Sequence, residues 1–534
     1  MDNTATASAS RRGRRLALAS GPAAAVIFVL VAVYVLASQN HFVGFEPGYN
    51  ERQPKHHGWV SSHALAIISH ATSENGFVGY ALAYAEPDGT IRYDYFDRYP
   101  VFFSAGMHAI LSVSDRLSSK AYIAKQVMNL IFLATMLTAY LIVDKLVQSK
   151  PAALAAALLA MSSEYLLFYK DMVHFDQPAL LGMMILIYTI ALYRIDGRRR
   201  APYLGAVLAV SLGRGYASFA VLLTWLVTEW VMTLRQHGFS MRASLRALAM
   251  QPVTRVCVLS LGLGALMLSY NIGVESIRTG VAPLQTSIIQ SAENRLGLDP
   301  AFNDRYEKVV SWGGFLTDQM DRLVRWSVPL RRPGGETPGN VLLLASALGV
   351  IAVQGARWDP ERRLLVVLLA ASGFVWMIGM RNMSGPHEYT TMYYIGLPLA
   401  FYAALFSLLK IPSRPAVAWA LLLGALGFFF VANQRTQELH LELELRSDGL
   451  VRLSDYTWDM MRIREQLSGE GLHIHMVQGI PNAPYAMGFY LQEQYLSSLV
   501  DADYVITWDS HLLPGNLTPE NERLFLFRGP AWGQ

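Results

Sequence analysis

The chain has 534 residues, of which 53% are hydrophobic and only 16% are charged, and its mean hydropathy is +0.27. This balance excludes a soluble enzyme of ordinary composition, because so many apolar side chains need lipid as their solvent. The formal net charge of +4 is small, so the positions of Lys and Arg say more than their number.

The N-terminal segment carries the first orientation signal. Arg11, Arg12, Arg14 and Arg15 precede an apolar run at 22–37. Under the positive-inside rule, this pattern predicts a membrane anchor with residues 1–21 in the cytoplasm. A cleavable signal peptide is the alternative, because small residues near the end of that run could form a cleavage site.

Apolar runs of helical length recur along the first 432 residues. A helix needs about 20 apolar residues to cross a hydrocarbon core of roughly 30 Å. With the run at 22–37, the sequence predicts about eleven spans. The others lie at 122–147, 151–169, 178–193, 202–212, 216–234, 256–270, 340–353, 364–380, 394–409 and 416–431. If the chain starts in the cytoplasm and the spans cross the membrane in alternate directions, every short basic loop lies on the cytoplasmic side. The runs at 202–212 and 340–353 are too short to cross the bilayer without support from neighbouring helices.

The fold class is therefore an α-helical polytopic membrane protein with a transmembrane domain at 22–432. Its long outside loops are at 41–120 and 274–339. Apolar residues at helical spacing within 60–68 and 101–113 predict two helices lying in the membrane surface, with an ordinary packed loop as the alternative.

The tail at 433–534 changes character and predicts a small α/β domain outside the membrane. We expect helices at 454–467 and 484–496 and strands at 473–477, 504–507 and 524–527. No Walker-type or GxGxxG loop occurs in the sequence, which argues against nucleotide-driven transport. The single cysteine, Cys257, lies in an apolar run, so the chain has no disulfide framework of its own.

Chemistry-bearing residues gather in the outside loops. The first loop combines histidines, aromatic rings, an acid and a cation: His56, His57, Trp59, Tyr95, Asp97 and Arg98. Transfer of a polar head group needs a proton acceptor, a cation for phosphate and aromatic faces for a sugar ring, and this loop holds each type. The alternative is a solvated loop whose Trp and Tyr residues are interfacial anchors.

Two further loops on the same predicted side are rich in polar residues. The loop after the third span contains Lys170, Asp171, His174 and Asp176, and Asp176 either belongs to a site or caps the helix that follows Pro178. Arginines on the outside run against the usual charge bias. Arg214 and Arg381, the latter close to His387 and Tyr389, could therefore grip a lipid phosphate, or could snorkel to head groups.

The histidines do not follow a metal-binding pattern. No HExxH or comparable pairing is present, and adjacent residues such as His56 and His57 rarely aim at one ion. We therefore predict no catalytic transition metal and no certain cofactor. A divalent cation held by Asp94, Asp97 or Asp176 stays an open alternative.

At these residues the chain resembles the GT-C membrane glycosyltransferases, in particular the group of protein O-mannosyltransferases and lipid A aminoarabinose transferases. The stretch His56 to Ser61 stands where that group has an acidic pair and a surface helix, and Tyr95 to Pro100 stands at its Tyr-rich Lys-Pro-Pro stretch. Asp176 to Leu180 is similar to its Asp-x-Pro-Leu, and His387 to Pro398 to its His-Tyr stretch. The resemblance covers about residues 22–432 in arrangement.

The resemblance implies a polyprenyl-phosphate sugar donor and a lipid, glycan or protein acceptor, with no nucleic-acid partner. Histidines replace the acidic pair, so His57 or His56, or alternatively Asp97 or Asp176, would be the base, and Arg98 would replace the lysine that meets the donor phosphate. The implied catalytic residues are His57, His56, Asp97 and Asp176. The implied substrate-binding residues are Trp59, Tyr95, Arg98, Lys170, Asp171, His174, Arg214, Arg381, His387 and Tyr389.

The leading hypothesis is an inverting glycosyltransferase of a plasma or inner membrane, with its active site and tail domain on the non-cytoplasmic side. Three alternatives stay open: a lipid or solute transporter or flippase, a polymerase or ligase of lipid-linked saccharides, and a structural partner in an envelope complex. A transporter would carry ionisable residues deep within its spans, whereas the polar residues here gather at the outer lip.

Overall fold

The structure is a computed structural model that describes most of the chain. Outside the description lie residues 1–20, 39–56, 214, 297, 306–310, 328–336, 386, 446–459, 461–462, 468, 470, 477–490, 492–493, 499, 508–524 and 529–534. The side chains of a few residues inside helices are also outside it, among them those of His57, Trp59 and Glu388.

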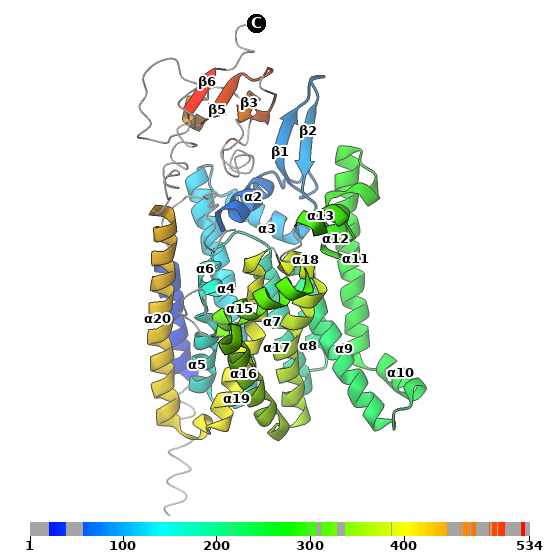
Figure 1. The fold of residues 1–534 in the computed structure, drawn as a ribbon, viewed down its shortest axis with the longest axis vertical. Coiled ribbons are helices and arrows are strands. Elements are labelled where there is room, and N and C mark those ends of the chain that lie inside the picture. Colours follow the sequence, from blue (N-terminus) through cyan, green and yellow to red (C-terminus); the bar gives the residue numbers. More distant parts are fainter. Residues whose placement is uncertain are drawn as a thin grey trace, which may run out of the picture.

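The described part of the chain forms a helical bundle capped at one end by short helices and a sheet (Figure 1). Seven of its helical segments are long and apolar enough to cross a membrane. They are α4 (Leu117–Val147), α7 (Asp176–Arg194), α9 (Tyr216–Gln236), α11 (Pro252–Thr279), α17 (Pro360–Gly379), η2 with α19 (Glu388–Ile395 and Gly396–Leu408) and α20 (Pro415–Leu445). The protein is therefore an integral membrane protein.

Four shorter apolar helices occupy the remaining predicted spans: Gly21–Ala37, α5 (Lys150–Met161), α8 (Ala201–Gly213) and α16 (Thr337–Arg357). The span predicted at 151–169 is wrong as one helix, because α5 ends at Met161 and α6 (Glu164–Phe168) follows. The Ser162 hydroxyl donates back to the Leu158 carbonyl, and the Ser163 side chain caps α6 by accepting from the Leu166 amide. These two serines end one helix and begin the next.

The short α8 is held by close packing against α7. A Cβ atom added at Gly182 would lie 2.9 Å from the Ala209 Cα, and one at Gly213 would lie 2.5 Å from the Ala179 Cα. Small residues therefore let the two backbones approach, which is how helices associate where no water drives them together. This contact with α7 supplies the support from a neighbouring helix that the short span at 202–212 requires.

Two helices of the first outside loop, α2 (His57–Ser69) and α3 (Val101–Leu111), cover the end of the bundle (Figure 1). Both helices were expected, and the apolar stripe of α2 faces the protein interior. Its apolar residues from Ala64 to Ile68 are fully buried, since α2 packs against β1 and α3. By contrast, α3 exposes 60% of Phe102 and 41% of Ile110.

A six-stranded sheet lies beyond these helices, in the order β2-β1-β4-β3-β5-β6. Its strands are β1 (Tyr80–Ala85), β2 (Ile91–Tyr95), β3 (His473–Met476), β4 (Tyr495–Leu496), β5 (Tyr504–Thr507) and β6 (Phe525–Arg528). The first two come from the first outside loop and the others from the tail. β1 pairs in parallel with β4 through Tyr84 and Leu496, so the sheet joins the two regions.

Three predicted strands of the tail appear as β3, β5 and β6. The helix predicted at 484–496 is wrong at its end, where β4 pairs with β1 and β3, and its start lies outside the described residues. Residues 463–466 are helical, as predicted, and the start of that helix also lies outside the described residues. A shared hydrophobic cluster, which includes Ile474 and Ile506 of the tail with Leu65 of α2, gives the sheet its core.

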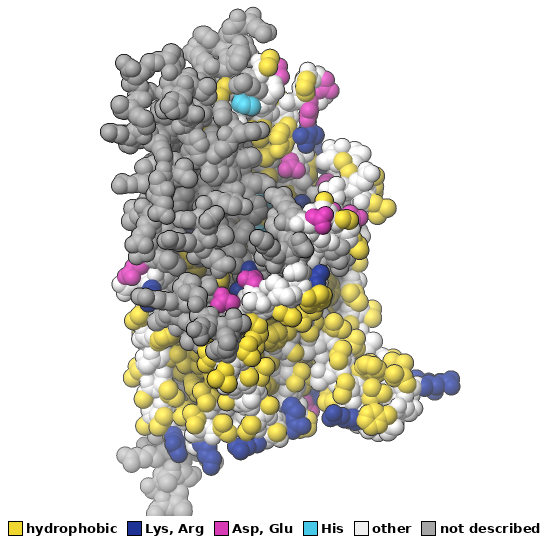
Figure 2. Space-filling model, in the orientation of Figure 1, with side chains coloured by type: hydrophobic (Ala, Val, Ile, Leu, Met, Phe, Trp, Pro, Cys, Tyr) yellow, Lys and Arg dark blue, Asp and Glu magenta, His cyan; other side chains and the backbone are white. Residues whose placement is uncertain are grey.

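The remaining short elements lie at the two ends of the bundle. They are α10 (Met241–Ala249), η1 (Pro283–Gln285), α12 (Ser287–Leu296), α13 (Pro300–Arg305), α15 (Trp312–Ser327), α18 (Arg381–Ser384) and η3 (Ile411–Ser413). In Figure 2, hydrophobic side chains cover the lower half of the visible face, and Lys and Arg side chains gather along its lower edge. This basic end of the bundle contains the loops predicted to be cytoplasmic.

Candidate functional site

Three of the predicted loops meet at the end of the bundle opposite the basic end. The ring of Tyr99 lies 5.2 Å from that of His174, and His174 lies 5.7 Å from Tyr389. These residues come from the first outside loop, from the loop before α7 and from η2. The structure therefore brings together side chains separated by as many as 290 positions in the sequence.

Asp176, two residues after His174, is an ionisable group with only 1% of its surface exposed. Its Oδ2 lies 2.5 Å from His174 Nδ1, and its Oδ1 accepts a hydrogen bond of 2.5 Å from the Tyr393 hydroxyl. The helix cap is Phe175, so Asp176 is a first-turn residue and the N-cap prediction is wrong. At this position the helix dipole favours a negative charge.

The short distance between His174 Nδ1 and Asp176 Oδ2 favours the tautomer in which Nδ1 carries the proton. An imidazole that donates from Nδ1 to a carboxylate carries its lone pair on Nε2, where it can accept a proton. The carboxylate also stabilises the imidazolium that forms once the proton has arrived. The rings of Tyr99, Phe175 and Tyr389 surround His174 and limit its exposure to water. The arrangement of His174, Asp176 and Tyr393, called here the His174 triad, can therefore act as a general base.

Lys170 and Asp171 lie in the same loop and are both buried. Burial lowers the pKa of Lys170, Asp171 acts against that shift, and the nearby cation of Lys125 adds to it. The Lys170 Nζ reaches the Leu167 carbonyl only at 3.5 Å. The ammonium groups of Lys170 and Lys125 are cations of the kind that can contact a phosphate.

Asp97 is fully buried and is held by α11 and the start of α12. The Ser287 hydroxyl donates to Asp97 Oδ1 at 2.6 Å and lies 3.2 Å from Glu275 Oε2. Asn271 Nδ2 donates to the backbone carbonyls of Asp97 and Tyr99, each at 2.8 Å. We call Asn271, Glu275 and Ser287 the Asp97 clamp. Sequence reasoning missed it, although Asn271 and Glu275 are polar residues four apart at the end of an apolar span.

The hydroxyl of Ser287 separates two carboxylates, and its removal should be costly. We expect Ser287→Ala to destabilise the protein by about 1–3 kcal/mol, because it removes the hydroxyl that donates to the buried Asp97 carboxylate, whereas Glu275 keeps the backbone amide of residue 287 as a donor. Ser287→Thr keeps the hydroxyl and should behave like the wild type. Thermal unfolding of the purified protein in detergent measures both variants, and equal stability of Ser287→Ala and the wild type would contradict the bridging role.

The carboxylates considered for a divalent cation do not converge on one point. Asp97 lies beside Glu275, Asp176 pairs with His174, and Asp94 is exposed. Within the described ranges, no group of three or more His, Cys, Asp or Glu side chains could hold a metal ion.

Arg98 and His63 both contact the ring of Phe96. The Arg98 guanidinium carbon lies 4.6 Å from the centre of the Phe96 ring, and the His63 ring meets that ring edge-on at 4.7 Å. Burial, followed by the charges of Arg98 and His174, lowers the pKa of His63 to about 3. His63 is therefore neutral near pH 7 and serves as packing beside the His174 triad.

This lowered pKa predicts acid sensitivity. The folded-state pKa of about 3 lies below the ordinary value of 6.5, so the unfolded chain binds more protons between these two values. Stability should fall as the pH drops below the ordinary value, by on the order of 2 kcal/mol at about pH 5. We expect His63→Gln to lose this dependence and His237→Gln, at the exposed His237 of the basic end, to keep it. Unfolding temperatures measured near pH 7 and at about pH 5 test this prediction. An equal loss of stability in the wild type and in His63→Gln between these two pH values would disprove it.

Two predicted substrate-binding residues point elsewhere. Tyr95 lies on β2 in a cluster with Tyr80 and Tyr93, and its hydroxyl donates to Asn75 Oδ1 at 2.9 Å. Arg381 stacks on Trp312, with its guanidinium carbon 4.4 Å from the ring centre. Neither contact joins these residues to the His174 triad.

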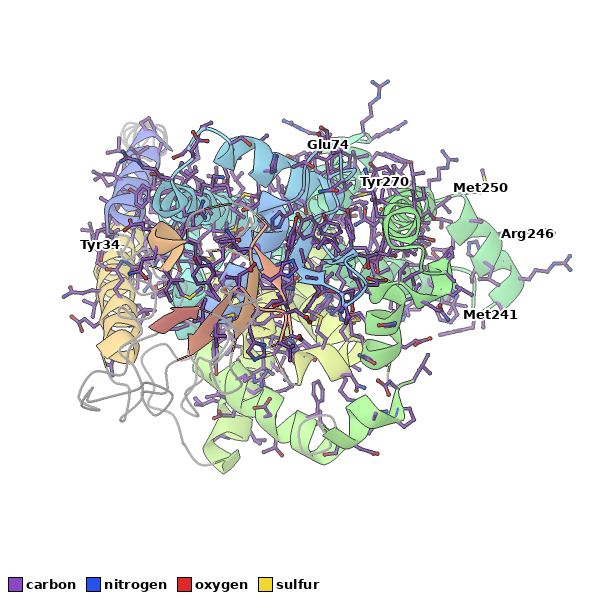
Figure 3. The ribbon with its side chains drawn as sticks, turned by 90° about the horizontal axis from the view of Figure 1, so that it is seen from above. Tyr34, Glu74, Met241, Arg246, Met250 and Tyr270 are labelled. Atoms are coloured by element: carbon purple, nitrogen blue, oxygen red, sulfur yellow. The ribbon has the colours of Figure 1, made fainter. Side chains whose placement is uncertain are left out.

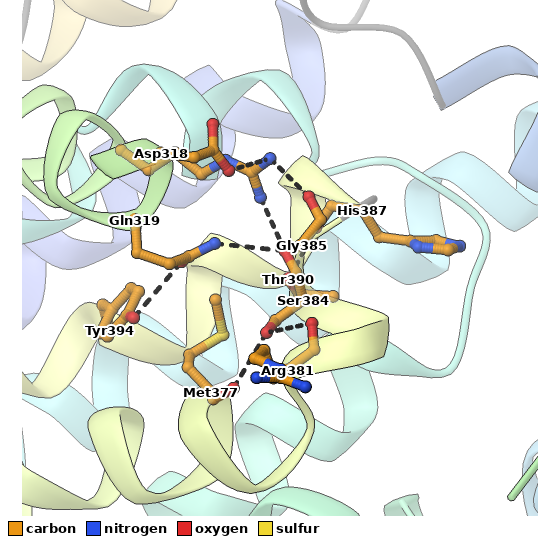
Figure 4. Close-up of polar contacts among 10 residues, drawn as sticks. Asp318, Gln319, Met377, Arg381, Ser384, Gly385, His387, Thr390 and Tyr394 are labelled. Carbon is orange, nitrogen blue, oxygen red and sulfur yellow. Dashed lines mark hydrogen bonds and ion pairs between the residues drawn. The ribbon is translucent and has the colours of Figure 1, made fainter. Parts of the chain in front are cut away.

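The loop that carries His387 and Tyr389 is held by a residue that sequence reasoning missed (Figure 4). Buried Arg322 of α15 donates to the carbonyls of Ser384 and Gly385, at 2.8 and 2.9 Å, and forms an ion pair of 2.6 Å with Asp318. His387 lies 5.5 Å from Tyr389 by ring centres. Arg322 thus fixes the entry to η2, which presents Tyr389 and Tyr393 to the site.

Four predicted site residues cannot be placed. His56 and Arg214 lie outside the described residues, and the side chains of His57 and Trp59 do as well, although α2 begins at His57. The structure therefore leaves the histidine pair of the first loop as a prediction.

Comparisons with known proteins give fold-level likeness only. No family model and no curated protein matches the chain. The oligosaccharyltransferase of Archaeoglobus fulgidus, solved with a tethered acceptor peptide, is similar over 91% of this chain and 69% of its own, with 12% identity and a TM-score of 0.47. The arabinofuranosyltransferase AftD from Mycobacteria is similar over 87% of this chain and 30% of its own, with 13% identity and a TM-score of 0.42.

Proposed function

We propose that this protein is a GT-C-type membrane glycosyltransferase that moves a sugar from a polyprenyl-phosphate donor to a lipid, glycan or protein acceptor. The observation that carries the proposal is the His174 triad: an imidazole, a buried carboxylate and a tyrosine hydroxyl assembled at one end of an apolar helical bundle. A base at the membrane boundary suits a reaction whose donor is anchored in lipid and whose acceptor is polar.

The proposed step is an inverting displacement. The acceptor hydroxyl gives its proton to Nε2 of His174 while its oxygen forms a bond to the anomeric carbon of the sugar. The bond between that carbon and the phosphate oxygen breaks, and polyprenyl phosphate leaves with the electron pair. Asp176 holds the imidazole and stabilises its charged form. The cations of Lys170 and Arg98 are the groups we assign to the phosphate, whose charge grows as it leaves.

The proposal also assigns sides to the membrane. The basic end of the bundle would face the cytoplasm, because positively charged short loops are retained there. The His174 triad and the sheet would then face the other side, where a polyprenyl-phosphate donor replaces a nucleotide sugar. Labelling of single cysteines introduced at Asp88 and at Arg199 by a membrane-impermeant thiol reagent in intact cells tests this: only the first should react.

The decisive experiment is transfer from a panel of radiolabelled polyprenyl-phosphate sugars by the purified protein in liposomes. Wild type is compared with His174→Gln, Asp97→Asn and Asp176→Asn. A matched control is Asp196→Asn, because Asp196 also forms an ion pair, with Lys145, but at the basic end. Release of polyprenyl phosphate by wild type and the control, with loss in His174→Gln, supports the proposal.

Two outcomes would overturn the assignment. A wild type that transfers no sugar from any donor, but moves the intact lipid across the bilayer, would indicate a flippase. Sugar transfer that is retained in His174→Gln but lost in Asp97→Asn would identify Asp97, rather than His174, as the base.

A further inference from the structure

Helix α10 lies at the basic end of the bundle and projects sideways from it (Figure 1). It links the end of α9 to the start of α11. Seen from above, Met241, Arg246 and Met250 lie at the outer margin of the molecule, with the Arg246 side chain directed away from the bundle (Figure 3). This helix is not used by the proposed reaction.

The side chains of α10 divide into an apolar face and a basic edge. Met241, Leu245 and Leu248 follow one another at spacings of four and three residues, which places them on one face of the helix. Met241 and Leu245 expose 54% and 53% of their surfaces, whereas Leu248 is buried against the bundle. Arg242 and Arg246 are exposed and lie about 100° around the helix from this face.

Two more large apolar residues flank α10 in the sequence and are also exposed. Phe239, just before α10, is 74% exposed, and Met250, just after it, is 71% exposed. Large apolar side chains so exposed, on one short segment next to lipid-facing helices, indicate a covering partner.

The same segment is strongly basic. Between residues 231 and 255 the sequence contains four arginines, Arg235, Arg242, Arg246 and Arg255, and no Asp or Glu. Among the described residues, no carboxylate forms an ion pair with Arg242 or Arg246. The charge of this surface therefore calls for an anionic partner.

The position of α10 is fixed by contacts with its neighbours. Gln251 Nε2 donates to the Thr233 hydroxyl of α9 at 3.2 Å, and the Thr254 hydroxyl of α11 donates to the Leu248 carbonyl at 2.7 Å. Ser244 is fully buried on the side that faces the bundle. The helix is thus held across the ends of two spans, at the level where a bilayer changes from acyl chains to head groups.

We propose that α10 is an interfacial anchor: it lies in the head-group layer of the leaflet at the basic end, with Met241, Leu245 and the flanking Phe239 in the acyl boundary and Arg242 and Arg246 on the phosphates of anionic lipids. Long arginine side chains can reach head groups from the edge of such a face. A second copy of this chain is disfavoured as the partner, because it would present the same four positive charges. Lipid supplies both the apolar layer and the negative charge.

The test uses the full-length protein in liposomes. Cys257, the only cysteine, is replaced by serine, and a fluorescent NBD label is placed through Leu245→Cys on the apolar face or through Ala247→Cys on the opposite side. Vesicles contain phosphatidylcholine alone or with phosphatidylglycerol, and carry doxyl-labelled lipids as quenchers. We expect lipid quenching at position 245 to exceed that at 247, and iodide quenching from water to show the reverse order.

The arginines are tested in the same labelled protein. Arg242→Gln together with Arg246→Gln should lower the ratio of docked to undocked helix by about fivefold per arginine, only in vesicles with phosphatidylglycerol. Equal iodide quenching at positions 245 and 247 would overturn the proposal. So would lipid quenching that is the same with and without phosphatidylglycerol and with and without the two arginines. Shielding of position 245 from both quenchers, increasing with protein density, would identify a second copy or another protein instead.

Discussion

Asp176→Asn should lower kcat for sugar transfer by about a hundredfold to ten-thousandfold, the usual contribution of a positioned acid or base. The amide keeps the shape of the carboxylate, but it carries no charge to stabilise the His174 imidazolium. It can also present its NH₂ group to Nδ1, which would stabilise the tautomer that has no lone pair on Nε2. Because binding contacts are retained, KM should change little.

Two comparisons separate this role from general damage. Tyr393→Phe removes one of the two hydrogen-bond partners of Asp176 and should cost only about tenfold. Asp196→Asn should leave transfer unchanged. Initial rates with a saturating polyprenyl-phosphate donor, together with unfolding temperatures, give both readouts. A kcat for Asp176→Asn within a few-fold of the wild type would remove the His174 triad from the mechanism.

Arg322→Ala should destabilise the protein by about 3 kcal/mol, the lower range for breaking a buried ion pair. The lower range applies because the Asp318 side chain is 28% exposed and keeps some hydration, whereas that of Arg322 is only 5% exposed. The variant also strips the donors from two backbone carbonyls at the entry to η2. Loosening of this loop should displace Tyr389 and Tyr393, so transfer should fall together with stability.

Arg381→Ala is the matched control for that variant. Arg381 lies in the same region, but its described contact is a stack on Trp312, which is worth about 0.5–1 kcal/mol at an accessible site. Unfolding of both variants in detergent, followed by tryptophan fluorescence, compares them directly. If Arg381→Ala were the more damaging of the two, the loop would depend on the stack rather than on Arg322.

Much of the membrane architecture could be predicted from sequence, because the signals are local. An apolar run and its flanking arginines fix a span without reference to the rest of the chain, and every predicted span except 151–169 corresponds to one continuous helical segment. The failure at 151–169 is equally local: Ser162 and Ser163 interrupt an apolar run that hydropathy alone reads as continuous.

The sheet shows where local reasoning ends. The strands β3, β5 and β6 were predicted from their composition, but the same sheet also contains β1 and β2, which lie almost 400 residues earlier in the chain. A two-residue strand such as β4 carries no periodicity, and it forms only because β1 and β3 supply its hydrogen-bond partners. The end of the helix predicted at 484–496 is therefore replaced by β4, which pairs with β1 and β3.

By itself, the sequence determined that the chain is a helical membrane protein and where most of its spans lie. It also predicted that the loops around Asp97, His174 and Tyr389 carry the polar chemistry. Only the tertiary structure decided which of these groups meet. Tyr393 reaches Asp176 across 217 positions, and Ser287 reaches Asp97 across 190. Such contacts leave no pattern in a sequence, because a polar residue at the end of a span looks the same whether it meets water, lipid or a buried carboxylate.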